Sequence, residues 1–145
     1  MASLFSKIVT GEIPCHKIAE SEKFLAFLDI MPLRKGHTLV IPKIEVDYIF
    51  DLDDELLSEM IVFSKHVSKK IRATFPCNRV GLSVIGLEVP HAHIHLIPIN
   101  DLQDMNFMQE KCALSSDELM KIASDIRNAF RDNFEVNSSI NRLRE

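Results

Sequence analysis

One stretch of the chain, residues 53–75, limits the possible folds most because its apolar side chains recur at helical spacing. The repeat runs at steps of three and four through Leu56, Met60, Phe63, Val67, Ile71 and Phe75. This spacing is typical of one face of an amphipathic helix. Pro76 cannot continue the helix and marks its end. The pattern predicts one long helix whose apolar face must be buried against another layer.

Segments with the two-residue period of β-strands lie on both sides of this helix. They cover residues 16–21, 23–30, 37–42, 79–86 and 91–99. In the second segment, Phe24, Ala26 and Leu28 point to one face, while Leu25, Phe27 and Asp29 point to the other. We therefore expect an α+β protein with a five-stranded, mostly antiparallel sheet and with the helices on one face.

Two further helices and a polar tail complete the expected organisation. A short helix covers residues 4–9, before Gly11 and Pro14. The last helix opens at Ser115, which has capping-box spacing to Glu118. Its apolar stripe is Leu119, Ile122, Ile126 and Phe130. We expect one domain over residues 1–131 and a C-terminal tail over 132–145 that is either disordered or docked on a partner.

Composition narrows the class of protein. The 145 residues suit one domain, and an apolar content of 46% supports a real core. A net charge of -4 gives no reason to expect nucleic acid as a partner. No apolar run approaches the roughly 20 residues that cross a bilayer, and the N-terminus does not resemble a signal peptide. Three unpaired cysteines, Cys15, Cys77 and Cys112, suit a soluble cytoplasmic protein with no membrane contact.

The segment "PHAHIHLIP", residues 90–98, places His91, His93 and His95 on alternate positions. On a strand, side chains two residues apart share a face and lie about 6.7 Å apart. The three imidazoles are therefore expected to face a cleft, while the apolar residues between them face the core. A single histidine on a strand is usually an ordinary hydrogen-bonded group, whereas three in alternation favour a functional site.

Two kinds of chemistry use such a set of imidazoles. Zinc would need further ligands, for which Glu88 and His37 are candidates, but no cysteine pair supports a closed site. In the other chemistry, an imidazole attacks phosphorus and forms a covalent intermediate. The attacking nitrogen must then be unprotonated, so the other ring nitrogen needs an acceptor for its proton. We favour nucleophilic catalysis without a metal or a cofactor.

The segment "HAHIHLI" resembles the motif of the histidine-triad (HIT) family, His-φ-His-φ-His-φ-φ with φ apolar. The resemblance runs from Ser3 to Ile99, and "FSKI", "GEIP", "FLDIMP" and "GHTLVIPK" look like the N-terminal half of the Hint-like branch. It implies a HIT-like fold and a homodimer joined through the long helix and an edge strand. It also implies a hydrolase or transferase acting at the α-phosphate of purine nucleoside phosphoramidates or related nucleotide conjugates.

The resemblance also implies a role for each matched residue. His93 would be the nucleophile, and His91 and His95 would orient it and serve the phosphate and the leaving group. His37 would abut the triad from the next strand, and Asp29 would hold the ribose hydroxyls. The apolar walls around the base would be Phe5, Ile8, Phe27, Ile30 and Leu39. Without the resemblance, most of these apolar residues would be assigned to the core.

The segment before the triad, "GLSVIGLEVPH", departs from the family pattern. Many members carry an asparagine and a Gly-Gln-Ser/Thr run there, which contacts the phosphate. Leu87 and Glu88 stand at the glutamine and hydroxyl positions, and Ser83 is the candidate replacement for the asparagine. A carboxylate beside a phosphate repels it unless it is protonated or turned away. Glu88 is therefore a candidate to contact an amine-bearing leaving group.

Two further positions bear on the activity. Some relatives bind structural zinc through a CxxC pair, but here those positions are Ser3 and Ser6, so we expect no zinc. The branch that transfers nucleotides to sugar phosphates has glutamine at the last triad position, whereas this chain keeps His95, which favours hydrolysis. The alternatives are a nucleotide-binding regulatory protein with little turnover, a dinucleoside polyphosphate hydrolase, and a metalloprotein.

Overall fold

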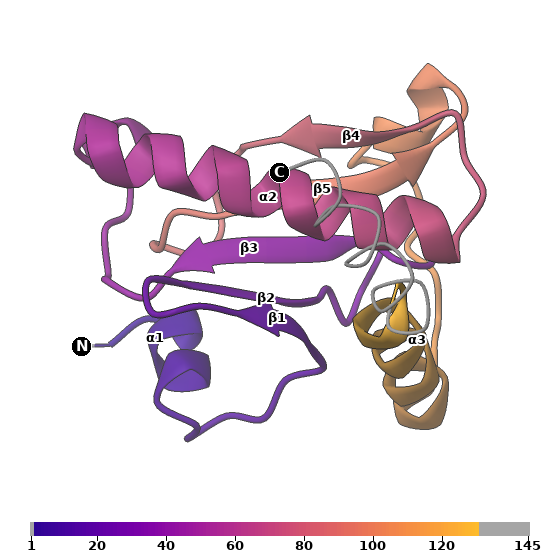
Figure 1. Cartoon of the computed structure of the whole chain (residues 1–145), viewed down its shortest axis with the longest axis horizontal. Helices are drawn as coiled ribbons and strands as arrows, with labels where there is room; N and C mark the ends of the chain where they lie inside the picture. Colours follow the sequence, from indigo (N-terminus) through magenta and orange to yellow (C-terminus); the bar gives the residue numbers. More distant parts are fainter. Residues whose placement is uncertain (1, 131–145) are drawn as a thin grey trace, which may run out of the picture.

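The chain folds around a five-stranded antiparallel sheet with the strand order β1-β2-β3-β5-β4 (Figure 1). The structure is a computed structural model and describes residues 2–130. The strands are β1 (Lys17–Glu20), β2 (Phe24–Leu28), β3 (Thr38–Pro42), β4 (Arg79–Ser83) and β5 (Ile94–Ile99). The helices are α1 (Leu4–Val9), α2 (Asp54–Thr74), α3 (Ser116–Asn128) and the short 3-10 turns η1 (Ile49–Asp51) and η2 (Leu102–Met105). The expected α+β class, with one long and one C-terminal helix, is confirmed.

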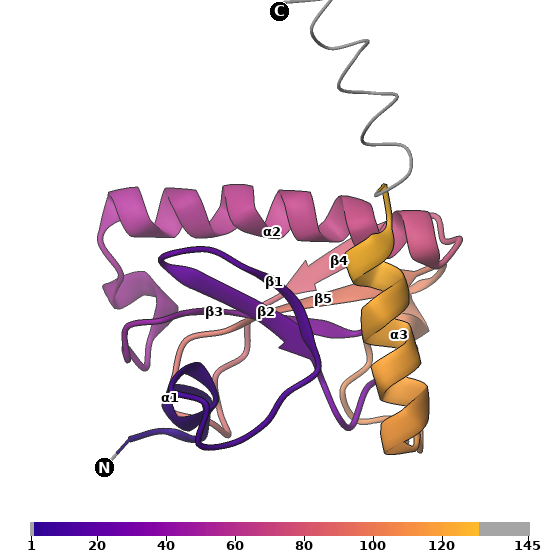
Figure 2. The same cartoon turned by 60° about the horizontal axis from the view of Figure 1, so that its bottom comes forward.

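Helices cover both faces of the sheet, so the expectation that all would lie on one face is wrong. Figure 2 shows α1 on the side of the sheet opposite α2. On the α1 side, Phe5 packs against Leu25, Phe27 and Leu39. On the other side, the alternate residues of β2 join the main core beneath α2 and α3. The opposite orientation of neighbouring β2 side chains follows from the two-residue period of a strand.

The apolar side chains whose spacing predicts α2 also pack this helix against the sheet. Asp53 caps its first turn by accepting the Leu56 N–H. Met60, Val67 and Ile71 are almost fully buried against the sheet, and burial of each such side chain contributes about 1.5–3 kcal/mol. The predicted cap of α3 is also present, since the Ser115 hydroxyl accepts the Glu118 N–H at 3.1 Å. The predicted tail, residues 132–145, lies outside the described residues, and the boundary at residue 131 stays a prediction.

The strand that carries the triad begins later than the sequence suggests. The predicted segment starts at residue 91, but β5 starts at Ile94. If the β3–β5 register continued, Ala92 would face Pro42, which has no N–H to donate. The Ala92 N–H instead donates to the Val46 carbonyl at 2.7 Å. His91 therefore precedes the regular ladder and is placed by other contacts.

The remaining strands are also shorter than predicted. The segment 79–86 forms a strand only to Ser83, and Gly86 then takes a φ of 74°, which favours glycine and turns the chain. Within the described part of the chain, no helix is long and apolar enough to cross a membrane.

Candidate active site

The structure brings the three histidines and His37 together on the α1 side of the sheet. His95 lies on β5, His93 lies just before it, and His37 lies just before β3. The intervening residues Ala92, Ile94 and Leu96 belong to the core on the opposite side. The predicted alternation is therefore present, although only His95 belongs to the regular ladder.

His93 is held by the backbone of its own segment. Its Nδ1 lies 2.8 Å from the His91 carbonyl oxygen, which can only accept a hydrogen bond. The proton of a neutral His93 ring is therefore on Nδ1, and Nε2 carries a lone pair. Within residues 2–130, this Nε2 makes no hydrogen bond. The edge of Phe5 packs against the ring, with centroids 5.0 Å apart, and His93 keeps 7% of its surface exposed.

His37 and His95 form a directed hydrogen-bonded pair. The Leu33 N–H donates to His37 Nδ1 at 3.0 Å, so the proton of a neutral His37 ring is on Nε2. That Nε2–H donates to His95 Nδ1 at 2.9 Å, so His95 carries its own proton on Nε2. Burial is the main cause that lowers the pKa of His37 to about 3 and that of His95 to about 4. Both rings are therefore neutral at pH 7, and His95 has an N–H donor left for a ligand.

His91 has no ring nitrogen left for a ligand. Its Nε2–H donates to the Pro42 carbonyl at 2.8 Å, and its Nδ1 accepts from the Ser3 hydroxyl at 2.8 Å. The side chain is fully buried, and burial is the first cause that lowers its pKa. The resemblance gives His91 a part in serving the phosphate and the leaving group. In the structure both of its ring nitrogens are hydrogen-bonded, and its backbone carbonyl accepts from His93.

Ser3 connects the triad to the first turn of α1. Its hydroxyl also accepts the Ser6 N–H at 2.9 Å, which caps the helix. The Glu45 carboxylate accepts the Ser3 N–H and the Ser6 hydroxyl. These hydrogen bonds, with the Ser3 backbone first, lower the pKa of Glu45 to about 2. Ser3, Ser6, Glu45 and His91 thus form one hydrogen-bonded cluster.

The donor set of this cluster does not fit structural zinc. Zinc sites of the CxxC type depend on thiolates, whereas Ser3 and Ser6 offer neutral hydroxyls. Those hydroxyls are already hydrogen-bonded to His91 and Glu45. A zinc ion would have to displace these hydrogen bonds and would gain only neutral hydroxyl ligands, which are weaker than thiolates. We therefore assign no metal to this position.

Asp29, His37 and His95 form a second cluster whose ligand atoms lie within 4.8 Å of one another. Asp29 Oδ2 lies 3.6 Å from His37 Nε2, and Asp29 Oδ1 accepts the Met31 N–H at 2.9 Å. Both nitrogens of His37 are already hydrogen-bonded, so a metal ion there would have to displace one of these bonds. Burial raises the pKa of Asp29, which keeps about a fifth of its side chain exposed.

The apolar residues assigned to the base separate into two groups. Phe5, Phe27 and Leu39 are buried together, and Ile8 packs partly buried against them. The Phe5 and Phe27 rings meet edge to face with centroids 5.6 Å apart. Ile30 differs, because it is 65% exposed beside Asp29. The structure therefore brings four of the five into one cluster and leaves Ile30 at the surface.

The two polar residues expected near the phosphate lie on the side of β4. Ser83 is the ladder partner of His95, so both side chains lie on the same face of the sheet. Glu88 is exposed and acts on Asp29 through space, where its charge raises the pKa of that carboxyl. The neighbouring Leu87 is almost fully exposed. Residues 83–88 therefore add the negative charge of Glu88 near Asp29 and contain no lysine or arginine.

Two residues that the sequence does not indicate, Phe107 and Lys111, lie beside the His37–His95 pair. The Phe107 ring lies 4.8 Å from the His95 ring and 6.2 Å from the His37 ring. The Lys111 ammonium lies 5.9 Å from the Phe107 centroid. The segment that carries them has neither a helical nor a strand period, so no local pattern indicates that it folds back over the triad.

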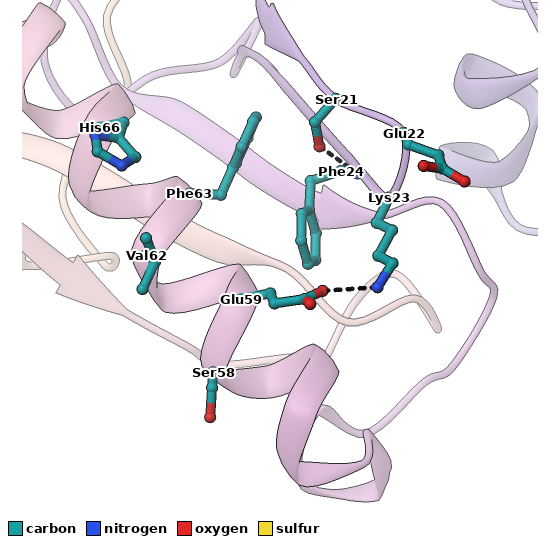
Figure 3. A pocket seen from close by; sticks show the side chains of 9 residues that line it. All are labelled: Ser21, Glu22, Lys23, Phe24, Ser58, Glu59, Val62, Phe63 and His66. Carbon is teal, nitrogen blue, oxygen red and sulfur yellow. Dashed lines mark hydrogen bonds and ion pairs between the residues drawn. The ribbon is translucent and has the colours of Figure 1, made fainter.

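A groove of about 520 Å³ lies elsewhere, between the β1–β2 turn and α2 (Figure 3). Phe24, Val62 and Phe63 line it, and its Lys23 and Glu59 form an ion pair at 2.9 Å. This groove includes no member of the triad. The charges of Lys23 and Glu59 are paired with each other, so the cluster of histidines remains the candidate site.

Comparison with known proteins identifies the family of the chain. The family model described as HIT domain matches residues 10–102. Over 99 residues, the chain is 40% identical to the adenosine 5'-monophosphoramidase hnt1 of Schizosaccharomyces pombe, which covers 68% of this chain and 74% of that relative.

Two solved structures share the fold over most of their length. One is a Hit-like protein involved in cell-cycle regulation from Bartonella henselae, with a TM-score of 0.76 and 29% identity, covering 88% of this chain and 95% of that chain. The other is a Zn-bound histidine triad family protein from Mycobacterium smegmatis, with a TM-score of 0.76 and 25% identity, covering 94% and 98%. The chain therefore belongs to the HIT family, and its likeness to hnt1 supports the Hint-like branch within it.

Proposed function

We propose that the protein is a nucleotide hydrolase that acts at the α-phosphate of purine nucleoside phosphoramidates or related nucleotide conjugates. One observation carries the proposal: the His91 carbonyl holds the proton of His93 on Nδ1, so Nε2 is a bare nucleophile. The relative named as an adenosine 5'-monophosphoramidase supports the same substrate class.

The reaction proceeds in two displacements. In the first, His93 Nε2 forms a bond to the α-phosphorus while the bond from phosphorus to the leaving atom breaks. In the second, water attacks the phosphorus and gives up a proton to solvent, the bond to His93 breaks, and the nucleoside monophosphate leaves. Covalent catalysis of this kind replaces one difficult displacement by two easier ones.

His95 and His37 act as a neutral donor pair. His95 Nε2–H donates a hydrogen bond to the leaving atom or to a phosphate oxygen, where negative charge develops. The pair holds no surplus proton, because each nitrogen between Leu33 and His95 is already committed to a hydrogen bond. A departing amine therefore takes its additional proton from solvent. His91 holds His93 in place and does not touch the substrate.

The remaining predicted residues bind the nucleoside. The partly exposed carboxylate of Asp29 accepts hydrogen bonds from the ribose hydroxyls. The base lies against the edge of the cluster that contains Phe5, Phe27, Ile8 and Leu39, and the exposed Ile30 covers it from the side of Asp29. Ser83, opposite His95 in the ladder, donates to a phosphate oxygen.

Intact mass after rapid quench with adenosine 5'-phosphoramidate tests the proposal. The wild type should show a nucleotidyl adduct that decays to AMP, and His93→Ala should show none. His66→Ala, which changes an exposed histidine on α2, serves as the control and should behave as the wild type. Saturable AMP binding without adduct or product would refute the hydrolase and favour the regulatory alternative.

A substrate panel separates the two enzymatic alternatives. We expect phosphoramidates to react faster than dinucleoside polyphosphates, because the exposed Glu88 repels an anionic leaving group and attracts an amine. In Glu88→Ser this preference should shrink. Unchanged rates on both substrates would remove Glu88 from the chemistry.

A homodimer is part of the proposal. Within the described residues β4 pairs with a neighbouring strand on one side only. Leu82 on β4 is exposed, and so are Val84 and Ile85, which follow this strand. An unpaired apolar strand edge favours pairing with a second copy. Light scattering after size exclusion would measure twice the 16.6 kDa of one chain. The expected cytoplasmic location and the absence of nucleic acid partners stay predictions.

A further inference from the structure

The segment between β5 and α3 is fixed against the loop that precedes β3. Asp104 in η2 is buried and accepts the Asn100 N–H at 2.8 Å. The same carboxylate pairs with Arg34 at 3.0 Å, in the loop between β2 and β3. A buried carboxylate with both backbone and guanidinium partners holds its segment firmly. One end of the segment is therefore held to the loop between β2 and β3.

The other end of the segment is tied to the same loop by Cys112. Its N–H donates to the Pro32 carbonyl at 2.8 Å, and its thiol lies 3.4 Å from the Leu33 carbonyl oxygen. Leu33 is the residue whose N–H sets the tautomer of His37. Lys111 precedes Cys112 in the chain, so it lies one residue from the backbone hydrogen bond between Cys112 and Pro32.

Between these two contacts, Phe107 packs against His95 and His37, and Lys111 packs against Phe107. The Phe107 ring packs edge-on against His95 at 4.8 Å. The Lys111 ammonium donates to the Phe107 carbonyl at 2.6 Å and is partly buried. An ammonium has three donors, so two remain for another acceptor. The positive charge is therefore held beside the aromatic ring that covers His95.

The electrostatic effect of Lys111 extends across the site. Burial is the main cause of the raised pKa of Asp29 and of the lowered pKa values of His37 and His95. The charge of Lys111 opposes the shift of Asp29 and adds to those of His37 and His95. The segment before the triad, by contrast, presents the exposed Leu87 and Glu88. Phosphoryl transfer needs positive charge or donors around the phosphate oxygens.

We infer that Lys111 binds the substrate phosphate and supplies the positive charge that the segment before the triad does not provide. The inference rests on the proposed function and extends it by naming a residue from the segment between β5 and α3. The ammonium donates one hydrogen bond to the Phe107 carbonyl, and its remaining donors contact the non-bridging oxygens of the substrate phosphate. Lys111 is then a catalytic residue that touches the phosphate.

Lys111→Met and Lys111→Arg test the inference, with Lys65→Met as the matched control. Lys65 lies on the exposed side of α2, so its loss changes the net charge equally without touching the site. We expect Lys111→Met to lower kcat/KM for adenosine 5'-phosphoramidate about 100-fold and Lys111→Arg to stay within about tenfold. Lys65→Met should match the wild type, and circular dichroism should show equal folding of all variants.

Ligand affinity distinguishes a phosphate contact from a structural role. Lys111→Met should weaken AMP binding about tenfold and leave adenosine binding unchanged. Equal losses for AMP and adenosine, or an unchanged rate of adduct formation, would overturn the inference. If the wild type forms no adduct but AMP affinity still depends on Lys111, the phosphate contact stands and the proposed hydrolase fails.

Discussion

Lowering the pH should destabilise the protein through the His37–His95 pair. The Leu33 N–H occupies His37 Nδ1, and the His37 Nε2–H points at His95 Nδ1. A further proton on the pair would either displace the Leu33 N–H or bring two N–H groups head to head. The folded state therefore resists protonation, whereas the unfolded chain does not. This conflict adds to burial, which is the main cause of the lowered pKa values.

The size of the effect follows from the unfolded pKa. A histidine of the unfolded chain has a pKa of 6.5, while the folded values are about 3 for His37 and about 4 for His95. Stability is complete above pH 6.5 and falls as the pH drops toward the folded values, because the unfolded state binds more protons. Between pH 7 and pH 5 each group contributes a loss of about 2 kcal/mol, about 4 kcal/mol together. At pH 5 this loss is set mainly by the unfolded pKa, since both folded values lie below 5.

Urea unfolding followed by circular dichroism measures the loss, since the chain has no tryptophan to report by fluorescence. His37→Gln should reduce the pH-dependent loss by about 2 kcal/mol, and the exposed His66→Gln should leave it unchanged. The raised pKa of Asp29 acts in the opposite direction, but it is common to the wild type and the His66 control. An equal loss in His37→Gln and the wild type would refute the assigned protonation state of the pair.

Three further substitutions test the supports of the site and core by the same urea assay. Ser3→Ala removes a helix cap and leaves His91 Nδ1 only the longer contact to the Ser6 hydroxyl at 3.4 Å, so it should cost about 1–2 kcal/mol and lower kcat, while Ser3→Thr should restore most of both. Gly36→Ala should cost about 1–3 kcal/mol, because Gly36 has a φ of 95° and a Cβ there would lie 2.9 Å from the Phe75 ring. Ile71→Ala should cost about 2–5 kcal/mol, since the side chain is fully buried and leaves a cavity.

The sequence predicts those parts of the fold that local periodicity determines. The stripe of α2 and the two faces of β2 are visible as spacing, and both are found as expected. The position of α1 is not visible in this way, because only Phe5 of that helix is buried. The start of β5 also depends on tertiary structure, since it follows from a proline on the neighbouring strand rather than from the triad segment itself.

The same distinction applies to the candidate site. The alternation of three histidines is a local pattern, and the resemblance to the HIT family points to His37. Phe107 and Lys111 carry no comparable signal, because their segment is placed by contacts to a loop about 70 residues earlier. A chain without secondary structure between two anchors has no period from which its position can be inferred.

The three triad histidines have equal spacing in the sequence, yet their neighbours leave them different numbers of free nitrogens. His91 is bonded at both nitrogens, one of them by Ser3 from 88 positions away. His95 is bonded at one nitrogen by His37, and His93 at one by the backbone of His91. The remaining nitrogen of His95 carries a proton, whereas that of His93 carries a lone pair. The group bonded to Nδ1 of each ring therefore decides which histidine is the donor and which is the nucleophile. A change in His37, or in the position of the His91 carbonyl, should exchange or abolish these roles even though the three triad histidines are unchanged.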